Sequence, residues 1–398
     1  MNDDEKKAAR DYFAGEVAEI MLTLPQVLGV KRGRDFTLDV ATRDGVHAKV
    51  HLENIFSETR DMSTEQRKLR IIVAYGSIGA PPVDAWSQVC GALVPVLRSA
   101  TYSIGTWAQQ PGAAPIRRPF LPFLDEIVVM DQPTTMMPIL RAMVSLWNVD
   151  EQTVFAVADS RKGLFSAPSV RLYDDKDGPL WIVQCEDAYE ASRLLVPGWL
   201  ASFRGRVEGE PIAIMPQRSI VMIGGDRRPA LIKRLLDKAA REFAVSTRGL
   251  SPALYSVDAE GRVIPYERAG HDELAVAVRV AHHELAYAEY EAQREVLNRI
   301  HASQKRDVYI SRYIVVVNGD KTEAQSCAVW PKKIRTYLPR AERVILTPSE
   351  APSECVDLPF SAIEARLNPL ANSHPLLFEA GEFPSEHELA ALATLART

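Results

Sequence analysis

Apolar and polar residues alternate along the N-terminal part of the chain with the periods of a helix and then of strands. Apolar residues at helical spacing predict an amphipathic helix over residues 4–24, which Pro25 ends. The stretches DFTLDVA and VHAKVHL then alternate with period two around an Asp-Gly pair, a strong signal for a tight turn. The chain is therefore expected to open with a helix and a β-hairpin.

Further apolar runs complete a first predicted unit, residues 1–107. RIIVAYG is interpreted as a strand, and residues 83–99 are interpreted as a helix despite Pro95. Residues 108–122 contain four prolines and a glycine in fifteen positions, a composition that cannot sustain a helix or a central strand. We expect a linker or long loop there.

A second predicted unit covers residues 122–268. EIVVM and LWIVQC are expected strands, and LRAMVSLWNV, DEQTVFAVADSRKG and AYEASRLLV are expected helices. PIAIMP, SIVMIGG, residues 229–245, LYSVD and RVIPYE then follow in the order strand, strand, helix, strand, strand. This order favours an antiparallel or mixed sheet with helices packed against it, which is an α+β fold.

The third predicted unit, residues 269–398, begins with a long helix over about 271–303 that leads into the strand VYISRYIVVV. RVILT is a short strand. A final helix follows Pro384, where Ser385 and Glu388 have the spacing of a capping box. The chain as a whole is thus expected to form two to three α+β units.

Composition and net charge exclude several classes of function and location from the expected ones. The 398 residues include 46% hydrophobic and 25% charged residues, which is typical of globular proteins, and the net charge is −5. Because no overall positive charge attracts nucleic acid or an anionic membrane, neither is an expected partner. The N-terminus has no secretion signal, and the longest apolar runs are far shorter than the ~20 residues of a membrane-spanning helix. We expect a cytoplasmic protein.

Metal and nucleotide motifs are absent from the sequence. The stretch HDELAVAVRVAHHELAY contains His271, His282 and His283, but Tyr287 stands where a zincin motif has its second histidine. We interpret these histidines as part of a partly solvated helix face and leave open whether they form a site. The four cysteines form no CxxC pair. No metal or other cofactor is expected.

The glycine pair in IVMIGGDRRPALIKRLL lies between a strand and a helix, where backbone amides are able to hold a phosphate. No lysine follows the glycines as in a P-loop, and Asp226 is interpreted instead as the N-cap of a helix with Pro229 in its first turn. The basic clusters KRGR, IRR and PKKIR, the last near Trp330 and Tyr337, are interpreted as solvated charges with packed aromatics; binding of an anion or stacking on a base is the alternative.

Three stretches carry a resemblance to a known family: PFLDEIVVMDQP, EDAYEASRLLVPGWLASFRGRVEGEPIAIMPQRSIVMIG and LSPALYSVDAEGRVIPY, together with VHLENIF. Over about residues 30–266 the chain resembles the YtpQ family, bacterial cytosolic proteins of unknown function. The resemblance implies an α+β fold and a cytosolic location, and it supplies no catalytic residue. Members have Asn-Arg-Asp where this chain has Gln217, Arg218 and Ser219, so a role that needs that carboxylate is not expected here.

The candidate binding residues are polar positions of the central unit. Asp187, Tyr189 and Arg193 form the polar entry to an otherwise apolar predicted helix, Arg218 stands at a strand turn, and Asp131 is a further candidate directly after the predicted strand EIVVM. The structural alternative is that Asp187 caps a helix, Tyr189 packs, and Arg193 pairs with a glutamate at 190 or 186.

Two functional hypotheses follow. The first is a non-enzymatic module that binds a protein partner, because several globular elements occur without a convergent polar motif. The second is a hydrolase or transferase whose site assembles from residues distant in sequence, with Asp131, Asp187, Arg218 and His283 as members. A cleft that gathers three or more of these four side chains favours the enzyme.

Overall fold

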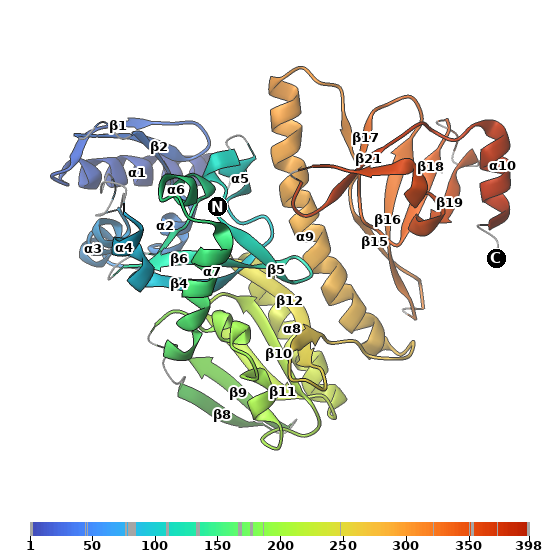
Figure 1. Cartoon of the computed structure of the whole chain (residues 1–398), viewed down its shortest axis with the longest axis horizontal. Coiled ribbons are helices and arrows are strands. Elements are labelled where there is room, and N and C mark those ends of the chain that lie inside the picture. Colours follow the sequence, from blue (N-terminus) through green and yellow to red (C-terminus); the bar gives the residue numbers. More distant parts are fainter. Residues whose placement is uncertain are drawn as a thin grey trace. The chain divides into compact units, whose positions relative to one another are not determined.

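The structure is a computed structural model that describes residues 3–43, 45, 47–75, 78, 85–108, 111–132, 136–165, 169–175, 178–185, 187–246, 248–320, 322–349, 351, 354–371 and 373–395. Helices and antiparallel or mixed sheets follow one another along the chain (Figure 1). The predicted α+β class is therefore confirmed. Among the described residues no helix has the length and apolar character needed to cross a membrane.

The chain divides into two compact units. The first comprises residues 1–94, 129–139 and 143–158, and the second comprises residues 95–128, 140–142 and 159–398. The three units predicted from the sequence, with boundaries near 107, 122 and 268, remain a prediction.

The first unit has a three-stranded antiparallel sheet in the order β1-β2-β3. Helix α1 buries Phe13, Val17 and Met21 against Leu38 and Val40 of this sheet. The predicted opening helix and β-hairpin are thereby confirmed, although Asp44 of the hairpin turn lies outside the described residues. The elements wholly or mostly in this unit are α1 (Asp3–Leu22), β1 (Val27–Arg32), β2 (Thr37–Thr42), β3 (His47–His51), α2 (Glu53–Glu58), α3 (Thr64–Tyr75), α4 (Trp86–Val89), β7 (Met136–Pro138), α6 (Arg141–Leu146) and α7 (Glu151–Ser160).

The division between the units passes through two strands, β4 (Leu93–Ser99) and β6 (Leu124–Asp131). In the second unit β6 pairs antiparallel with β5 (Arg117–Leu121), and the hairpin between them turns at Pro122 and Phe123. Phe123 has a φ of 63°, the left-handed conformation that a tight turn demands.

The second unit contains a six-stranded antiparallel sheet in the order β13-β12-β10-β11-β9-β8. Helices α8 and α9 cover one face, where Leu231 and Leu235 pack with Ile212 and Ile214. The other face packs on 3-10 segments that include Phe203. The elements are β8 (Ser169–Asp175), β9 (Gly178–Gln184), β10 (Pro211–Gln217), β11 (Ile220–Gly225), α8 (Pro229–Val245), β12 (Gly249–Val257), β13 (Val263–Pro265) and α9 (Glu273–Ser303).

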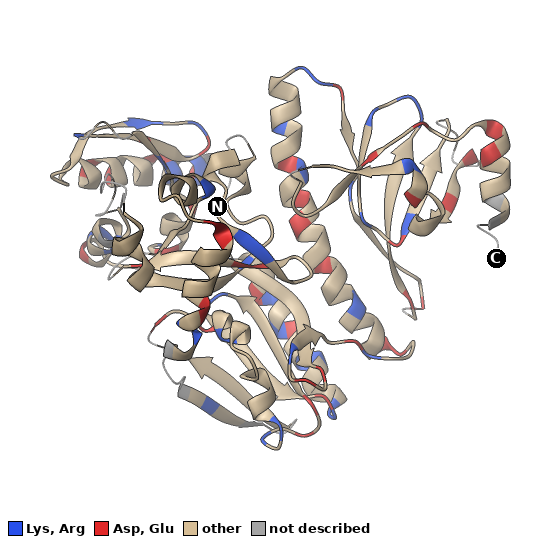
Figure 2. Ribbon diagram, viewed as in Figure 1, with Lys and Arg blue, Asp and Glu red and all other residues tan. Residues whose placement is uncertain are grey.

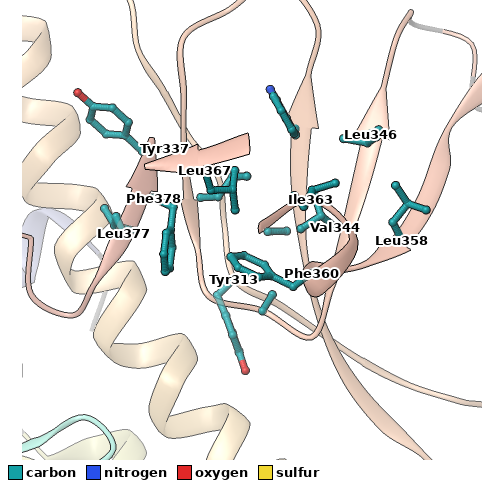
Figure 3. Packing of buried hydrophobic residues seen from close by; sticks show 14 of the residues in the cluster. Tyr313, Tyr337, Val344, Leu346, Leu358, Phe360, Ile363, Leu367, Leu377 and Phe378 are labelled. Carbon is teal, nitrogen blue, oxygen red and sulfur yellow. The ribbon is translucent and has the colours of Figure 1, made fainter. Parts of the chain in front are cut away.

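Two four-stranded mixed sheets follow α9, in the orders β14-β17-β21-β20 and β15-β16-β18-β19. Their shared core includes Tyr337, Val344, Phe360 and Phe378 (Figure 3). The elements are β14 (Tyr309–Ile310), β15 (Ile314–Val317), β16 (Ala324–Pro331), β17 (Thr336–Pro339), β18 (Arg343–Thr347), β19 (Val356–Pro359), β20 (Leu367–Pro369), β21 (Leu377–Ala380) and α10 (Glu386–Leu395).

Short 3-10 segments connect several of these elements. They are η1 (Cys90–Ala92), η2 (Pro111–Ala113), η3 (Lys162–Leu164), η4 (Ala191–Leu195), η5 (Leu200–Phe203), η7 (Phe360–Ala362) and η8 (Glu364–Arg366).

Two predictions in the first hundred residues were wrong in element type. RIIVAYG was expected to be a strand, but residues 70–75 of it form the end of helix α3, because Thr64 to Leu69 extend the helical pattern upstream of the apolar run. Gly76 lies outside the described residues. Residues 83–99 were expected to be a helix. From Ala85 on they form the short helix α4, a 3-10 turn and strand β4, in which Leu93 to Arg98 are all buried. Pro95 is compatible with that strand but disfavours a helix interior.

Three further predictions need correction. The proline-rich stretch 108–122 contains strand β5, which tolerates Pro119 because it is an edge strand of its sheet. AYEASRLLV forms only the 3-10 turn η4. VYISRYIVVV divides into β14 and β15, which belong to different sheets.

The start of α8 combines a confirmed and a wrong prediction. Pro229 is at the first helical position, as expected. The N-cap residue, however, is Arg228 and not Asp226, whose Oδ1 accepts a hydrogen bond from the Glu210 amide at 2.9 Å. In contrast, the capping box before α10 is confirmed, since Ser385 and Glu388 exchange side-chain to backbone hydrogen bonds.

Candidate functional site

The tip of the β5–β6 hairpin, Pro122 and Phe123, lines two clefts of the second unit. The Phe123 ring packs edge-on against Tyr290 of α9, with ring centroids 5.4 Å apart. We name the clefts after the histidine that each contains, His374 and His283. In both, residues far apart in the sequence lie close together.

The His374 cleft has a volume of about 560 Å³. Its walls are mostly apolar and aromatic, and its ionisable groups other than tyrosine are Asp125, Arg340 and His374. The lining residues are Ala100, Pro119, Phe120, Leu121, Pro122, Phe123, Asp125, Tyr290, Tyr313, Arg340, His374, Pro375 and Leu376.

A short hydrogen bond joins the two sides of this cleft. His374 Nε2 is 2.6 Å from Oδ2 of Asp125, which is 249 residues away in the sequence. The Asp125 side chain is 3% exposed and the His374 side chain 32% exposed. Because a carboxylate accepts hydrogen bonds, Nε2 carries the hydrogen in this contact, which leaves Nδ1 as the ring nitrogen with which His374 is able to act as a base. The buried acid therefore fixes the orientation and the tautomer of a solvent-accessible imidazole.

Both partners are held by their own elements. Asp125 lies on β6 opposite Pro119 and also accepts from Arg117 Nη1 at 3.3 Å. His374 lies between β20 and β21, in a turn that Ser373 closes: its hydroxyl donates to the Leu370 carbonyl and accepts from the Leu377 amide, both at 2.8 Å. His374 is thus positioned both by the hydrogen bonds of Ser373 to the backbone of the turn and by the Asp125 carboxylate.

A second buried acid lies on α9 near this pair. Glu289 is 6% exposed, and its Oε2 accepts a hydrogen bond from the Thr101 amide at 2.7 Å. Burial, with a smaller contribution from the Asp125 charge, raises the pKa of Glu289 to about 7. Glu289 therefore changes its protonation state near neutral pH.

The His283 cleft has a volume of about 480 Å³ and lies along the first half of α9, a helix that carries acidic and basic residues (Figure 2). Its polar lining includes His282, His283, Arg279 and Glu342. The ring of His282 donates through Nε2 to the Tyr266 carbonyl at 3.1 Å. Arg279 donates to two backbone carbonyls.

His283 is also committed to protein partners. Its Nδ1 is 2.8 Å from the Tyr313 hydroxyl and its Nε2 is 3.6 Å from Glu342 Oε2. Burial lowers the pKa of both His282 and His283, so both rings are neutral at pH 7. The His283 side chain is 12% exposed, against 32% for His374. His374 is therefore the more accessible of the two imidazoles.

Four of the predicted binding residues gather at one place. Asp187 accepts two hydrogen bonds from the Arg193 guanidinium, at 3.1 and 2.7 Å, and one from the Tyr189 amide. The Ala191 amide donates to the Arg218 carbonyl at 3.1 Å, which links this segment to the β10–β11 turn. Tyr189 is buried and stacks on Phe165, 5.3 Å between centroids.

The structural alternative for these residues is partly correct. Tyr189 packs as expected, but Asp187 caps no α-helix, and the partner of Arg193 in its ion pair is Asp187 and not Glu190. Glu186, the other expected partner, lies outside the described residues. Arg218 instead approaches Tyr102, whose ring also contacts Arg98.

The four residues proposed for a hydrolase or transferase do not meet in either cleft. His283 lines its own cleft, Asp187 and Arg218 lie elsewhere in the second unit, and Asp131 is an exposed residue of the first unit. His271 is exposed just before α9. Across the described residues, no group of three or more His, Cys, Asp or Glu side chains is arranged to hold a metal ion. The four cysteines are free.

Comparisons with models of protein families, with curated proteins and with solved structures found no match. The resemblance to the YtpQ family remains a prediction.

Sequence reasoning missed both members of the His374 pair and also Arg98. Asp125 lies near the start of an apolar strand, seven positions after Arg118 of an arginine pair, which is a weak signal for a buried, paired acid. His374 gave no such signal, because a single histidine in a proline-containing loop is commonplace. Arg98 was not singled out, because residues 83–99 were interpreted as a helix.

Proposed function

We propose that the protein is a hydrolase in which His374 acts as the general base in its cleft. The observation that supports this proposal is the 2.6 Å hydrogen bond between the buried Asp125 carboxylate and the accessible His374 ring. A carboxylate that orients an imidazole is the arrangement by which many enzymes prepare a base for proton abstraction.

The nucleophile in this proposal is water. None of the described residues that line the His374 cleft is Ser, Thr or Cys. Burial raises the pKa of the two lining tyrosines, Tyr290 and Tyr313, to about 12, so neither phenol is ionised as a nucleophile near neutral pH. His374 Nδ1 takes a proton from water as the water oxygen attacks the carbonyl carbon of an ester. The imidazolium, stabilised by Asp125, then returns the proton to the leaving alcohol as the ester bond breaks.

The walls of the cleft indicate the substrate class. Its volume of about 560 Å³ falls within the roughly 300–1,000 Å³ of small-molecule sites, and its apolar and aromatic lining suits a hydrophobic group. Arg340 is a cation of the lining that also pairs with Glu364 at 3.2 Å, and in this proposal its remaining N–H groups stabilise the negative charge that develops on the carbonyl oxygen. We therefore propose small esters with an aromatic or aliphatic group as substrates.

Hydrolysis of chromogenic esters tests the proposal. The wild-type protein is assayed with p-nitrophenyl acetate, butyrate and benzoate, beside His374→Gln, Asp125→Asn and the control His387→Gln, which changes an exposed histidine of α10. We expect His374→Gln to lower kcat/KM by about 100- to 10,000-fold, the usual contribution of a general base. Asp125→Asn is expected to lower it less, and His387→Gln to leave it unchanged.

Two outcomes reject the proposal: no ester is hydrolysed faster than in buffer, or His374→Gln retains the wild-type rate. The non-enzymatic protein-binding module is the competing proposal, and it predicts the first of these outcomes. The protein partner and the cytoplasmic location expected from the sequence likewise remain proposals.

A further inference from the structure

We propose that Arg98, Arg218 and Tyr102 form a binding site for a phosphate-type dianion. This inference is independent of the proposed hydrolase, because none of the three residues lines the His374 cleft. It rests on the geometry, the burial and the unbalanced charge of the two arginines.

The two guanidinium groups share one aromatic ring. The Cζ atom of Arg98 is 5.7 Å from the centroid of Tyr102, and that of Arg218 is 5.2 Å from the same centroid. Arg98 belongs to β4, Tyr102 follows that strand, and Arg218 lies in the β10–β11 turn. Three segments thus converge on one positively charged point.

The arginines have little access to water. Arg98 is 8% exposed and Arg218 is partly buried, and the Nε atom of each is buried with no hydrogen-bond partner. Nη1 of Arg98 donates to the Leu97 carbonyl at 2.8 Å, a neutral acceptor. Within the described part of the chain, neither arginine forms an ion pair with a carboxylate.

Two neighbouring guanidinium groups, those of Arg98 and Arg218, are energetically unfavourable when no counter-ion is bound. Burial and the mutual repulsion of the two groups lower the pKa of Arg98, and burial lowers that of Arg218. An arginine does not lose its proton in a protein, so the unfavourable energy persists until an anion neutralises the charge. Two guanidinium groups together carry the charge that matches a dianion, and their planar donors suit phosphate oxygens.

The site is held in place before a ligand binds. The Leu97 amide donates to the Ser192 hydroxyl at 3.1 Å, and the Ala191 amide donates to the Arg218 carbonyl at 3.1 Å. The segment of η4 therefore connects β4 with the β10–β11 turn. Arg193 in this same segment is neutralised by Asp187, which leaves Arg98 and Arg218 as the uncompensated charges.

Phosphate-dependent stabilisation of the full-length protein tests the site. Thermal unfolding is followed while sodium chloride is replaced by inorganic phosphate, or by sulfate, at constant ionic strength. For the wild type we expect Tm to rise with phosphate and to saturate. Arg98→Met and Arg218→Met are each expected to weaken the apparent affinity by at least about tenfold. The control Arg206→Met removes an exposed arginine that also stacks on an aromatic ring, Trp181, and should bind as the wild type does.

Circular dichroism before heating verifies that each variant is folded. The inference is overturned if phosphate raises Tm no more than chloride does, or if Arg98→Met and Arg218→Met respond as Arg206→Met does. A response to sulfate equal to that to phosphate supports a general dianion site, whereas a response to phosphate alone supports a phosphate ester as the natural ligand. His374→Gln should keep the phosphate response, so failure of the hydrolase proposal leaves this result unaffected.

Discussion

Two clusters of charged side chains in the second unit, each with at least one buried member, differ in how positive and negative charges are balanced. In the first cluster, Arg118 and Lys162 face Glu126 and Asp159, two cations against two anions. In the second, Arg98 and Arg218 both approach the Tyr102 ring, and no acid among the described residues forms an ion pair with either of them. In the first cluster the positive charges are neutralised by carboxylates of the protein, whereas in the second no described carboxylate neutralises them.

The geometry of the balanced cluster shows how complete its pairing is. Arg118 binds Glu126 through two hydrogen bonds of 2.8 Å and Asp159 through one of 2.6 Å. Lys162 Nζ is 2.9 Å from Glu126 and 3.0 Å from Asp159. Such a network needs no further ion and acts as structure. The comparison therefore teaches that burial of a charge does not by itself indicate a binding site, and that the missing counter-charge is the observation on which the proposed dianion site depends.

Glu126→Gln is expected to have the largest effect, because it breaks the balanced cluster. The Glu126 side chain is 4% exposed, and its loss of charge leaves Arg118 and Lys162 facing a single carboxylate. Breaking a buried pair of this kind lowers the free energy of unfolding by about 3–5 kcal/mol. Urea denaturation measures the change.

The matched control for that experiment is Glu260→Gln, which removes an exposed partner of Arg262. Exposed pairs contribute at most about 1 kcal/mol. If Glu126→Gln loses no more stability than Glu260→Gln, the balanced cluster is not a structural network.

Glu289 is a third kind of buried charged group, because it has no cation among the described residues as an ion-pair partner and becomes neutral by binding a proton. With a pKa of about 7 in the folded protein and about 4.3 when unfolded, Glu289 binds more protons in the folded state between these values. Stability therefore falls as pH rises from about 4.5 to 7. Glu289→Gln keeps an acceptor for the Thr101 amide and should remove this loss, raising the free energy of unfolding at pH 8 by about 3 kcal/mol.

Urea denaturation at pH 5 and pH 8 measures that difference. Glu295→Gln, an exposed position on the same helix, serves as the control and should retain the wild-type difference between the two pH values. An equal difference in Glu289→Gln and wild type would contradict the protonation of Glu289 in the folded state.

Local signals predicted the elements whose ends are defined by nearby residues. Helix α8 begins at Pro229 and α10 at its Ser385 capping box, as the sequence indicated. β4 and the end of α3 were misassigned, because a short apolar run such as VPVLR or IIVAY fits a buried strand and a buried helix equally well. Tertiary packing decides between them.

The candidate sites were less predictable, because they depend on contacts between distant segments. Arg218 was singled out as a polar residue at a strand turn, but its partner Arg98 lies 120 positions earlier, in the misassigned strand. Asp125 and His374 are 249 positions apart. No periodicity or motif connects such residues, so only the fold brings them together.

The smallest expected effect has the opposite sign to that of Glu126→Gln and most directly separates the two clusters. Arg218→Met removes one of two repelling buried charges, so in a buffer without phosphate or sulfate we expect the free energy of unfolding to rise by about 1 kcal/mol. Arg193→Met, in the neighbouring segment, breaks the pair with Asp187 and should instead lower it by about 3 kcal/mol. Urea denaturation of both variants tests this reversal. If Arg218→Met loses as much stability as Arg193→Met, then Arg218 has a structural counter-charge and the two clusters do not differ in kind.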